Sequence, residues 1–296
     1  MPNTPFYLDS QPVYFGGFKR EYADADFALF GVPFDCTSSY RPGSRFGPDA
    51  IREASANIET WSWRTGIDFE DLKVHDLGNV AVVYGDASET IRRVADTVED
   101  VNSTRKVPIM LGGEHLVTLG SAKAIKNCTF VSFDAHFDLR DEYLSNKLSH
   151  ACVMRRIMEE VGKERILLCG VRATFGEEVR WVKENGIKYM TSRDLLREGV
   201  SSSSLWLKEQ LKNAEKIYIS IDMDVIDPAY APGVGNPEPE GIAPSLLLDI
   251  LGEVIDDRVV GFDLVEVAPH YDNGMTAVLA SKMIFEICTM IKQARH

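Results

Sequence analysis

The run KIYISIDMDVIDPAYAPG, residues 216–233, begins as an apolar strand pattern and then carries two aspartates separated by one residue. A second run, SFDAHFDL at 132–139, places three polar side chains at the same alternate spacing. Side chains two apart on an extended backbone point the same way, so each strand end can aim its ligands at one point. The side chains concerned are Asp134, His136, Asp138, Asp222 and Asp224. Two such strands side by side predict a carboxylate-rich pocket for divalent cations, as in a two-metal hydrolase.

Short β-branched or aromatic runs alternate with helical patterns along almost the whole chain. The predicted strands are 26–33, 107–113, 129–135, 165–172, 216–224 and 259–267. The predicted helices are 48–62, 89–103, 116–126, 150–161, 175–185, 203–213, 244–256 and 273–293. Strands that are apolar on both faces and separated by helices indicate a mostly parallel sheet covered on both sides. Because no linker or repeat divides the chain, we expect a single α/β domain over residues 1–296, with SSSS at 201–204 approaching a helix start.

A third strand end adds a histidine to the candidate ligands. His115 follows the strand pattern VPIMLGG, in which Gly112 and Gly113 allow a tight exit from the strand. A lone aspartate or histidine is usually a cap or a hydrogen-bonded structural residue, but six metal-grade side chains at three strand ends predict a metal site. Four carboxylates and two imidazoles favour Mn²⁺, with Zn²⁺, Co²⁺ or Fe²⁺ as alternatives, and disfavour a structural zinc site. The four carboxylates would offset two divalent cations.

The composition is that of an ordinary globular protein with an acidic surface. The 296 residues are 45% hydrophobic and 26% charged, and the formal net charge is −13. This charge disfavours nucleic acid and anionic membranes as partners and favours a cationic substrate. The five cysteines form no C-x-x-C pair, which is typical of free thiols in a reducing compartment. Without a secretory pattern or an apolar run of membrane-spanning length, we expect a cytoplasmic protein.

The motifs resemble the ureohydrolase family of arginases, agmatinases and their relatives over nearly the whole chain. The family signatures GGEH (112–115), SFDAHFD (132–138) and SIDMDVIDPAYAPG (220–233) occur in order. The resemblance implies an arginase-like three-layer α/β/α fold around a parallel sheet of about eight strands, and a homo-oligomer that is a trimer or a hexamer. It also implies two Mn²⁺ ions per subunit. One ion would bind His115, Asp134, Asp138 and Asp222, and the other would bind Asp134, His136, Asp222 and Asp224.

The reaction implied by the resemblance is hydrolysis of a guanidinium C–N bond to urea and an amine. A hydroxide held between the two ions would be the nucleophile, since metal binding lowers the pKa of water. Asp138 would pass the proton of that hydroxide to the leaving nitrogen.

Two further residues receive roles by the same resemblance. Glu266, in GFDLVEVAPH, would pair with the guanidinium, whose fork of donors matches a carboxylate. A strand-end glutamate bound to a helix N-terminus is the alternative explanation. His150, in LSHACVMRR, would carry protons between bulk water and the metal centre, because imidazole titrates near neutral pH. A helix-capping role stays open for it, since Ser149 and His150 begin a helical pattern.

The identity of the guanidinium compound depends on residues near the D-x-H-x-D motif. Arginases carry an asparagine two residues after its last aspartate, where this chain has Arg140, so arginine is disfavoured. GGEH rather than GGDH, together with SHACVMRR, resembles the agmatinases and implies hydrolysis of agmatine to putrescine and urea, a step of polyamine biosynthesis. Asp141 and Glu142 are candidate partners for the distal ammonium of agmatine, although solvated loop acids explain them equally well.

Other activities fit the sequence less well. A guanidino acid such as 4-guanidinobutyrate is the alternative substrate, because Arg140 would suit its carboxylate. Val234 and Asn236 replace the threonines of many relatives, with no evident effect on specificity. A two-metal phosphoesterase is disfavoured because the chain lacks the G-D-x-x-D and G-N-H-[DE] runs and carries the wrong net charge for an anionic substrate. A non-catalytic, ureohydrolase-like regulator would have degenerate ligands, whereas all six are present.

Overall fold

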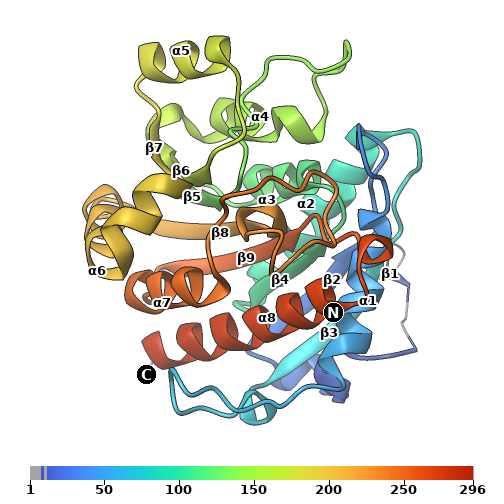
Figure 1. Cartoon of the computed structure of the whole chain (residues 1–296). Coiled ribbons are helices and arrows are strands. Elements are labelled where there is room, and N and C mark those ends of the chain that lie inside the picture. The colour runs from blue at the N-terminus through green and yellow to red at the C-terminus, as the bar shows by residue number, and fades with distance from the viewer. Residues whose placement is uncertain (1–7, 10–11, 296) are drawn as a thin grey trace.

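Nine strands form one continuous sheet in the computed structural model, which describes residues 8–9 and 12–295 (Figure 1). The strands are β1 (Leu8–Asp9), β2 (Phe27–Val32), β3 (Val74–Val80), β4 (Val107–Gly112), β5 (Cys128–Phe133), β6 (Ile166–Val171), β7 (Lys188–Thr191), β8 (Lys216–Asp222) and β9 (Val259–Val265). Their order across the sheet is β1-β3-β2-β4-β9-β8-β5-β6-β7. The two-residue β1 runs antiparallel to β3, and the other pairings in this sheet are parallel. The predicted parallel sheet of about eight strands is confirmed, with a short ninth strand added.

Helices cover both faces of the sheet. They are α1 (Gly47–Ser55), α2 (Ala87–Ser103), α3 (Thr118–Ala124), α4 (Val153–Val161), α5 (Gly176–Asn185), α6 (Ser192–Gln210), α7 (Pro244–Val254) and α8 (Met275–Ala294). The buried side chains form two clusters, one shared by α1, α6, α7 and α8 and the other by α2, α3, α4 and α5. In β8, Ile217 and Ile219 belong to the first cluster and Tyr218 to the second, as expected for a strand buried on both faces. Within the described residues, no helix is long and apolar enough to span a membrane.

The apolar pattern alone missed β1, β3 and β7. β3 reads VHDLGNV, and its Asp76 and Asn79 interrupt the apolar run. Both side chains are buried because they accept hydrogen bonds from the guanidinium of Arg52 on α1. β7 has four residues at the edge of the sheet, where Met190 alone is buried. Polar strands of this kind become apparent only once their tertiary partners are known.

Two predicted helix boundaries were wrong. α1 ends at Ser55 rather than near residue 62, because the following loop turns away and its Ser62 donates a hydrogen bond to Glu286 of α8 at 2.7 Å. α6 begins at Ser192, where Thr191 and Asp194 form a capping box. The serines at 201–204 therefore lie inside this element. They follow Gly199, whose φ of 65° interrupts the helix, so they begin its second segment.

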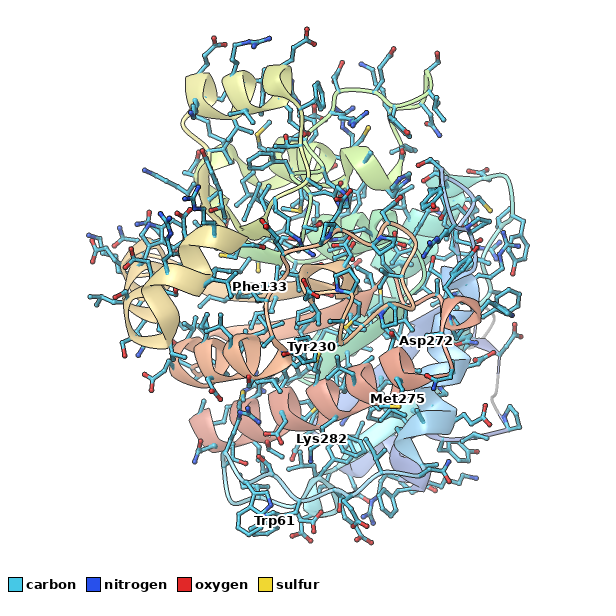
Figure 2. All side chains as sticks on the ribbon, viewed as in Figure 1. Trp61, Phe133, Tyr230, Asp272, Met275 and Lys282 are labelled. Atoms are coloured by element: carbon cyan, nitrogen blue, oxygen red, sulfur yellow. The ribbon has the colours of Figure 1, made fainter. Side chains whose placement is uncertain are left out.

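Hydrogen bonds to two loops fix α8 in place (Figure 2). Asp272 accepts hydrogen bonds from the backbone N–H groups of Gly274 and Thr276 at 2.8 and 2.7 Å, which satisfies donors at the start of the helix. Lys282 donates to the carbonyl oxygen of Trp61 at 2.8 Å and so ties the loop after α1 to the helix surface.

The five cysteines are free thiols, as the sequence predicts. Cys36 is exposed and the other four are buried. Burial raises the pKa of Cys128 and of Cys169 to about 12, so both thiols stay protonated at neutral pH.

Replacing Arg52 with leucine is expected to lower the free energy of unfolding by about 3–5 kcal/mol, because it leaves a buried charge on Asp76 without a partner. Arg52 is 1% exposed and donates to the two Asp76 carboxylate oxygens at 2.8 and 2.9 Å. Urea-induced unfolding measures the change. Lys208→Leu is the matched control, because its ion pair with Glu253 is exposed and should contribute less than about 1 kcal/mol. Equal losses in the two variants would contradict this account.

Candidate metal centre

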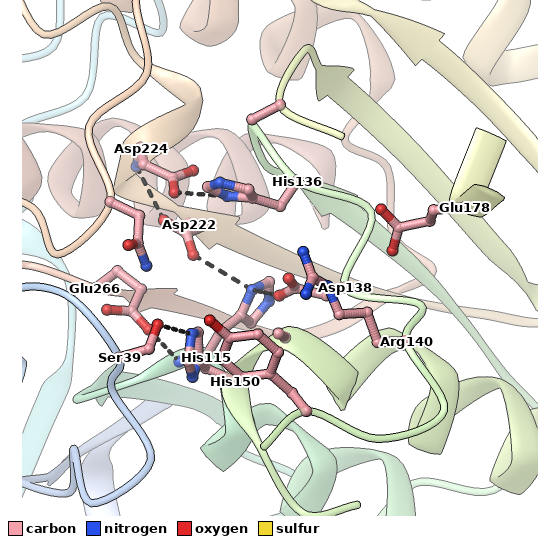
Figure 3. A pocket seen from close by; sticks show the side chains of 14 residues that line it. Ser39, His115, His136, Asp138, Arg140, His150, Glu178, Asp222, Asp224 and Glu266 are labelled. Carbon is pink, nitrogen blue, oxygen red and sulfur yellow. Dashed lines mark hydrogen bonds and ion pairs between the residues drawn. The ribbon is translucent and has the colours of Figure 1, made fainter. Parts of the chain in front are cut away.

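The carboxyl ends of four neighbouring strands meet at one edge of the sheet. β4, β9, β8 and β5 are adjacent in that order although they are far apart in the chain. The polar side chains that follow them therefore gather in one place, and Figure 3 shows all of them except Asp134. These are His115 after β4, Asp134, His136 and Asp138 after β5, Asp222 and Asp224 at the end of β8, and Glu266 after β9. The fold thus brings all six predicted ligands together with the carboxylate predicted to meet the guanidinium.

One group of donor atoms converges on His115. The Nδ1 atom of this residue lies 3.0 Å from Asp134 Oδ2, 3.2 Å from Asp138 Oδ2 and 3.3 Å from Asp222 Oδ2. All four residues are at most 9% exposed. Donor atoms of His115, Asp134 and Asp138 have the chemistry and the spacing to hold one divalent cation, and Asp222 lies beside them.

A second group of donor atoms lies on the other side of Asp134. His136 Nδ1 is 3.0 Å from Asp224 Oδ2 and 3.5 Å from Asp134 Oδ1. Donor atoms of these three residues all lie within 4.8 Å of one another. Asp134 therefore presents one carboxylate oxygen to each group, which is the geometry of a residue shared by two cations.

Backbone N–H groups orient these carboxylates. Asp134 Oδ1 accepts a hydrogen bond from the His136 N–H at 2.6 Å. Asp224 Oδ1 accepts one from Ala135 at 3.0 Å, and Asp222 Oδ1 accepts one from Asp224 at 2.9 Å. In Asp222 and Asp224 the second oxygen, Oδ2, is left to face the imidazoles. The alternate spacing in D-x-H and D-x-D supplies donor and acceptor within one short turn, so the local sequence sets much of the geometry.

The electrostatics of the cluster are those of buried carboxylates with too little positive charge. Burial, followed by the charges of Asp224 and Asp134, raises the pKa of Asp222 well above its usual range. Burial and the charge of Asp134 raise the pKa of Asp138 to about 7. Burial alone would lower the pKa of His115, but its contacts with the three carboxylates outweigh that effect and raise it. Without a cation, these raised pKa values mean that bound protons offset the negative charge of the carboxylates.

Two buried polar atoms at the centre of the cluster indicate whether the site suits a metal ion. His115 Nδ1 and Asp134 Oδ2 face each other at 3.0 Å, yet neither has a hydrogen-bond partner within the described part of the chain. Buried polar atoms are normally satisfied, and a cation placed between these two would bind both. Oxygen and imidazole donors without a thiolate suit Mn²⁺ and similar ions. The residues therefore fit a pair of divalent cations.

A hydrogen-bonded chain behind His115 fixes the orientation of its ring. His115 Nε2 lies 3.1 Å from Ser220 Oγ, and that hydroxyl donates to Asp263 at 2.6 Å. Support of this kind sets the ring orientation and tautomer of a metal-binding histidine. Neither Ser220 nor Asp263 was predicted from the sequence as a site residue. The signal available was a charged residue in the middle of the apolar strand VVGFDLV.

Glu266 lies next to the first donor group and is 6% exposed. Its N–H donates to the Gly113 carbonyl at 2.8 Å, and its Oε1 accepts from the N–H of His115 at 2.8 Å. Burial and the charge of Glu114 raise its pKa well above the usual range. A cationic group arriving in the cavity would restore the ionised form. The other oxygen, Oε2, remains available for such a partner, so one side chain can support His115 and bind a substrate.

His150 also lines the site and begins the 3₁₀ segment His150–Cys152 before α4. Neither its side chain nor that of Ser149 caps this segment, so helix capping does not account for the histidine. Burial and the positive charge of His136 lower the pKa of His150 to about 4. The imidazole is therefore neutral at pH 7 and able to accept a proton.

Two residues of the site adopt backbone conformations that favour glycine. The φ angle of Asp138 is 52° and that of Glu266 is 66°. A non-glycine residue in this region costs on the order of 1–3 kcal/mol, and such strain concentrates at functional sites. The strained backbone at these two positions lowers the stability of the fold and sets the orientation of the two carboxylates.

A cavity of about 120 Å³ opens over the two donor groups. Besides predicted residues, it is lined by Ser39, Arg140, Tyr143, Ala151, Ala173, Glu178 and Asn236. Its volume suits a small linear molecule and excludes a macromolecule. Of the two departures from the family pattern, Asn236 lines this cavity, whereas Val234 is fully buried in the core.

The loop acids proposed for the distal end of the substrate do not line the cavity. Asp141 is turned outward and pairs with Arg156 at 2.8 Å and with Lys147 at 3.6 Å, and Glu142 is exposed. A different carboxylate, Glu178 on α5, occupies the cavity wall and is 8% exposed. It accepts hydrogen bonds from the Leu139 N–H and from Thr174 Oγ1, which hold it in place.

Comparison with known proteins places the chain in a family. Residues 25–290 match the model of the arginase family. The chain is 39% identical to the N(1)-aminopropylagmatine ureohydrolase of Thermococcus kodakarensis, over 88% of this chain and 89% of that protein. It is 38% identical to the agmatinase of Bacillus subtilis, over 91% and 93% of the two chains. The crystal structure of the agmatine ureohydrolase of Thermoplasma volcanium matches with a TM-score of 0.89 at 37% identity, covering 97% of this chain and 96% of that one.

The chain therefore belongs to the arginase family. Its relatives are ureohydrolases, which makes it a hydrolase and confirms the resemblance and the arginase-like fold predicted from the sequence. The two donor groups that share Asp134 agree with the binuclear metal centre of this family.

Proposed function

We propose that this hydrolase cleaves agmatine to putrescine and urea at a centre of two Mn²⁺ ions. The observation that carries the proposal is Asp134, which presents one oxygen to each of two donor groups, with Glu266 beside them. The agmatinase and agmatine ureohydrolase among the relatives support the choice of substrate. The net charge of −13 favours a cationic substrate over an anionic one.

His115, Asp134, Asp138 and Asp222 would hold one ion, and Asp134, His136, Asp222 and Asp224 would hold the other. Contacts of 3.0 to 3.5 Å between imidazole and carboxylate atoms support these sets, and the assignment of Asp222 to both follows the family resemblance. When bound, two such cations lower the pKa of water and so supply a nucleophile at neutral pH.

The remaining steps belong to side chains of this protein. The Glu266 carboxylate binds the guanidinium and orients its carbon towards the donor groups, since a planar fork of N–H donors matches a carboxylate. Asp138 carries a proton to the departing nitrogen, because its carboxylate belongs to the first donor group and also lines the cavity. His150 exchanges protons between the cavity and bulk water.

Glu178 is the best placed partner for the distal ammonium of agmatine. It is the cavity carboxylate that lies outside the two donor groups and apart from Glu266, and hydrogen bonds hold it in one orientation. A buried carboxylate with a fixed position favours an ammonium over a neutral or anionic end group.

A guanidino acid is the second candidate substrate, and Arg140 is the observation that favours it. Its guanidinium lies 4.8 Å from the ring centroids of both Tyr143 and Phe175 and lines the cavity. It makes no ion pair with a carboxylate in the part of the chain that the structure describes. A substrate carboxylate would supply that partner.

Urea release from agmatine, arginine and 4-guanidinobutyrate by the Mn²⁺-loaded enzyme tests the proposal. We expect a clear preference for agmatine in kcat/KM. A preference for 4-guanidinobutyrate would contradict agmatine as the substrate and support the guanidino acid instead. Absence of urea from all three, with two ions bound, would refute the proposed substrates.

Two variants should shift the preference in opposite directions. Glu178→Gln should lower kcat/KM for agmatine by about tenfold or more, because the distal ammonium loses its charged partner. Arg140→Gln should leave agmatine turnover unchanged or improved and should lower 4-guanidinobutyrate turnover by a similar factor of about ten. The measurement is the ratio of the two kcat/KM values for each variant. If neither variant changes the ratio, these residues do not contact the distal end.

We further propose a cytoplasmic homo-oligomer, a trimer or a hexamer, that supplies putrescine for polyamine biosynthesis. The family resemblance supports the assembly, and the free, mostly buried thiols support a reducing compartment.

A further inference from the structure

Glu114, the glutamate of the GGEH motif, is fully buried and belongs to neither donor group. Its Oε2 accepts a hydrogen bond from the backbone N–H of Thr37 at 2.7 Å, and its Oε1 accepts one from the Thr37 hydroxyl at 2.7 Å. Both carboxylate oxygens thus bind Thr37 in the loop after β2, and the backbone of Ser38 contributes a further contact. A buried glutamate that fixes one threonine in this way needs an explanation, because burial of a carboxylate is costly.

The hydroxyl of Thr37 connects Glu114 to His150. This hydroxyl accepts a hydrogen bond from the backbone N–H of His150 at 2.9 Å, and it lies 3.3 Å from His150 Nδ1. A hydroxyl has one hydrogen and two lone pairs. The hydrogen of Thr37 is committed to Glu114, so towards Nδ1 the hydroxyl can only accept. The Ser149 hydroxyl, 3.4 Å from the same nitrogen, can rotate either to donate or to accept.

A proton on Nδ1 is favoured, because a bare Nδ1 would place its lone pair against a lone pair of the Thr37 oxygen. The other ring nitrogen, Nε2, then holds the lone pair. Nε2 lies 3.4 Å from the hydroxyl of Ser39, an exposed residue that lines the cavity mouth (Figure 3). A histidine that carries protons needs this polarity, with its basic nitrogen directed to the cavity and to solvent.

We propose that Glu114 is a positioning residue that acts through Thr37 to hold His150 in the Nδ1–H tautomer, with Nε2 as the proton-accepting atom. The inference rests on the proposed proton-carrying role of His150. It also gives the glutamate of GGEH a role distinct from that of the adjacent His115, which faces the metal cluster.

The substitution Glu114→Gln has a specific expected consequence. The glutamine oxygen can still accept from the Thr37 N–H, but its NH₂ group must then donate to the Thr37 hydroxyl. The hydrogen of that hydroxyl is released and can donate to His150 Nδ1. The histidine should therefore change to the Nε2–H tautomer, although the substitution preserves size and shape.

Ring ¹⁵N and ¹³C NMR of histidine-labelled, full-length enzyme loaded with diamagnetic Zn²⁺ reads out the tautomer directly. The chain has six histidines, and the signal lost in His150→Asn assigns the residue. We expect Nδ1–H in the wild-type enzyme and Nε2–H in Glu114→Gln. An Nε2–H tautomer in the wild type, or an unchanged tautomer in the variant, would overturn the proposal. This measurement needs no substrate, so its result is independent of the proposed activity.

Kinetics on Thr37 variants provide the second test. Thr37→Val removes the hydroxyl at constant volume and should lower kcat by about 10–100-fold, the usual effect of losing a supporting hydrogen bond. KM and metal content should stay at the wild-type values. Thr37→Ser keeps the hydroxyl and should restore most of kcat. Unchanged kcat in Thr37→Val, or loss of metal in that variant, would show that Thr37 does not position His150.

Discussion

Asp134→Asn is expected to leave one metal ion or none on each chain and to slow urea release by roughly 10³-fold or more, the equivalent of several kcal/mol of transition-state stabilisation. The reason is the position of this carboxylate between the two donor groups. Its Oδ2 faces His115 at 3.0 Å and its Oδ1 faces His136 at 3.5 Å. An amide presents one oxygen instead of two and carries no charge, so it cannot serve both sites. Metal analysis of the purified variant, together with a urea assay, measures both effects.

Asp141→Asn is the matched control for this substitution. It makes the same chemical change seven residues along the chain, on a carboxylate that pairs with Arg156 at 2.8 Å and is 56% exposed. It should keep both ions and most of the activity, because exposed ion pairs contribute little. Full metal content and normal turnover in Asp134→Asn would show that this residue is not shared between two ions.

Glu266→Gln is expected to reduce kcat/KM for agmatine by an amount equivalent to about 2–5 kcal/mol, the usual loss when one partner of a buried charged pair is neutralised. The glutamine would direct an NH₂ group at the N–H donors of the guanidinium. Metal content should be unchanged, because Glu266 belongs to neither donor group. Steady-state kinetics and metal analysis on the same preparation measure the two quantities.

Glu142→Gln serves as the control for Glu266→Gln. Glu142 is an exposed acid of the loop that follows the D-x-H-x-D motif, and it does not line the cavity. Its replacement should leave kcat/KM within about twofold, as expected for a surface substitution. Loss of metal in Glu266→Gln would mean that its hydrogen bond to the His115 N–H matters more than contact with the substrate.

The six candidate ligands were predictable from the sequence because their geometry is local. In D-x-H-x-D and D-x-D, alternate residues at the end of a strand point the same way, and backbone N–H groups of the same turn orient Asp134 and Asp222. The β2, β4, β5, β6, β8 and β9 strands were predictable for a similar reason, since strands buried on both faces have continuous apolar runs.

The distal end of the cavity was not predictable, because it depends on contacts between segments distant in the chain. Asp141 precedes a helix that carries Arg156, and this pairing turns the carboxylate away from the cavity. Glu178 and Arg140 take its place in the cavity wall. β3 was hidden for the same kind of reason, since its polar residues are satisfied only by Arg52 from α1.

The sequence by itself determined the fold class, the family resemblance and the candidate metal ligands, because periodicity and short spacings depend only on neighbouring residues. The tertiary structure decided which strand ends meet. The order β4-β9-β8-β5 places His115, His136, Asp222 and Glu266 around one cavity. It also decided how Ser220, Asp263, Thr37 and Glu114 support the histidines, since each of those hydrogen bonds joins residues at least 43 positions apart. Long-range hydrogen bonds leave no periodic trace in a sequence, because their partners are fixed only when the sheet assembles.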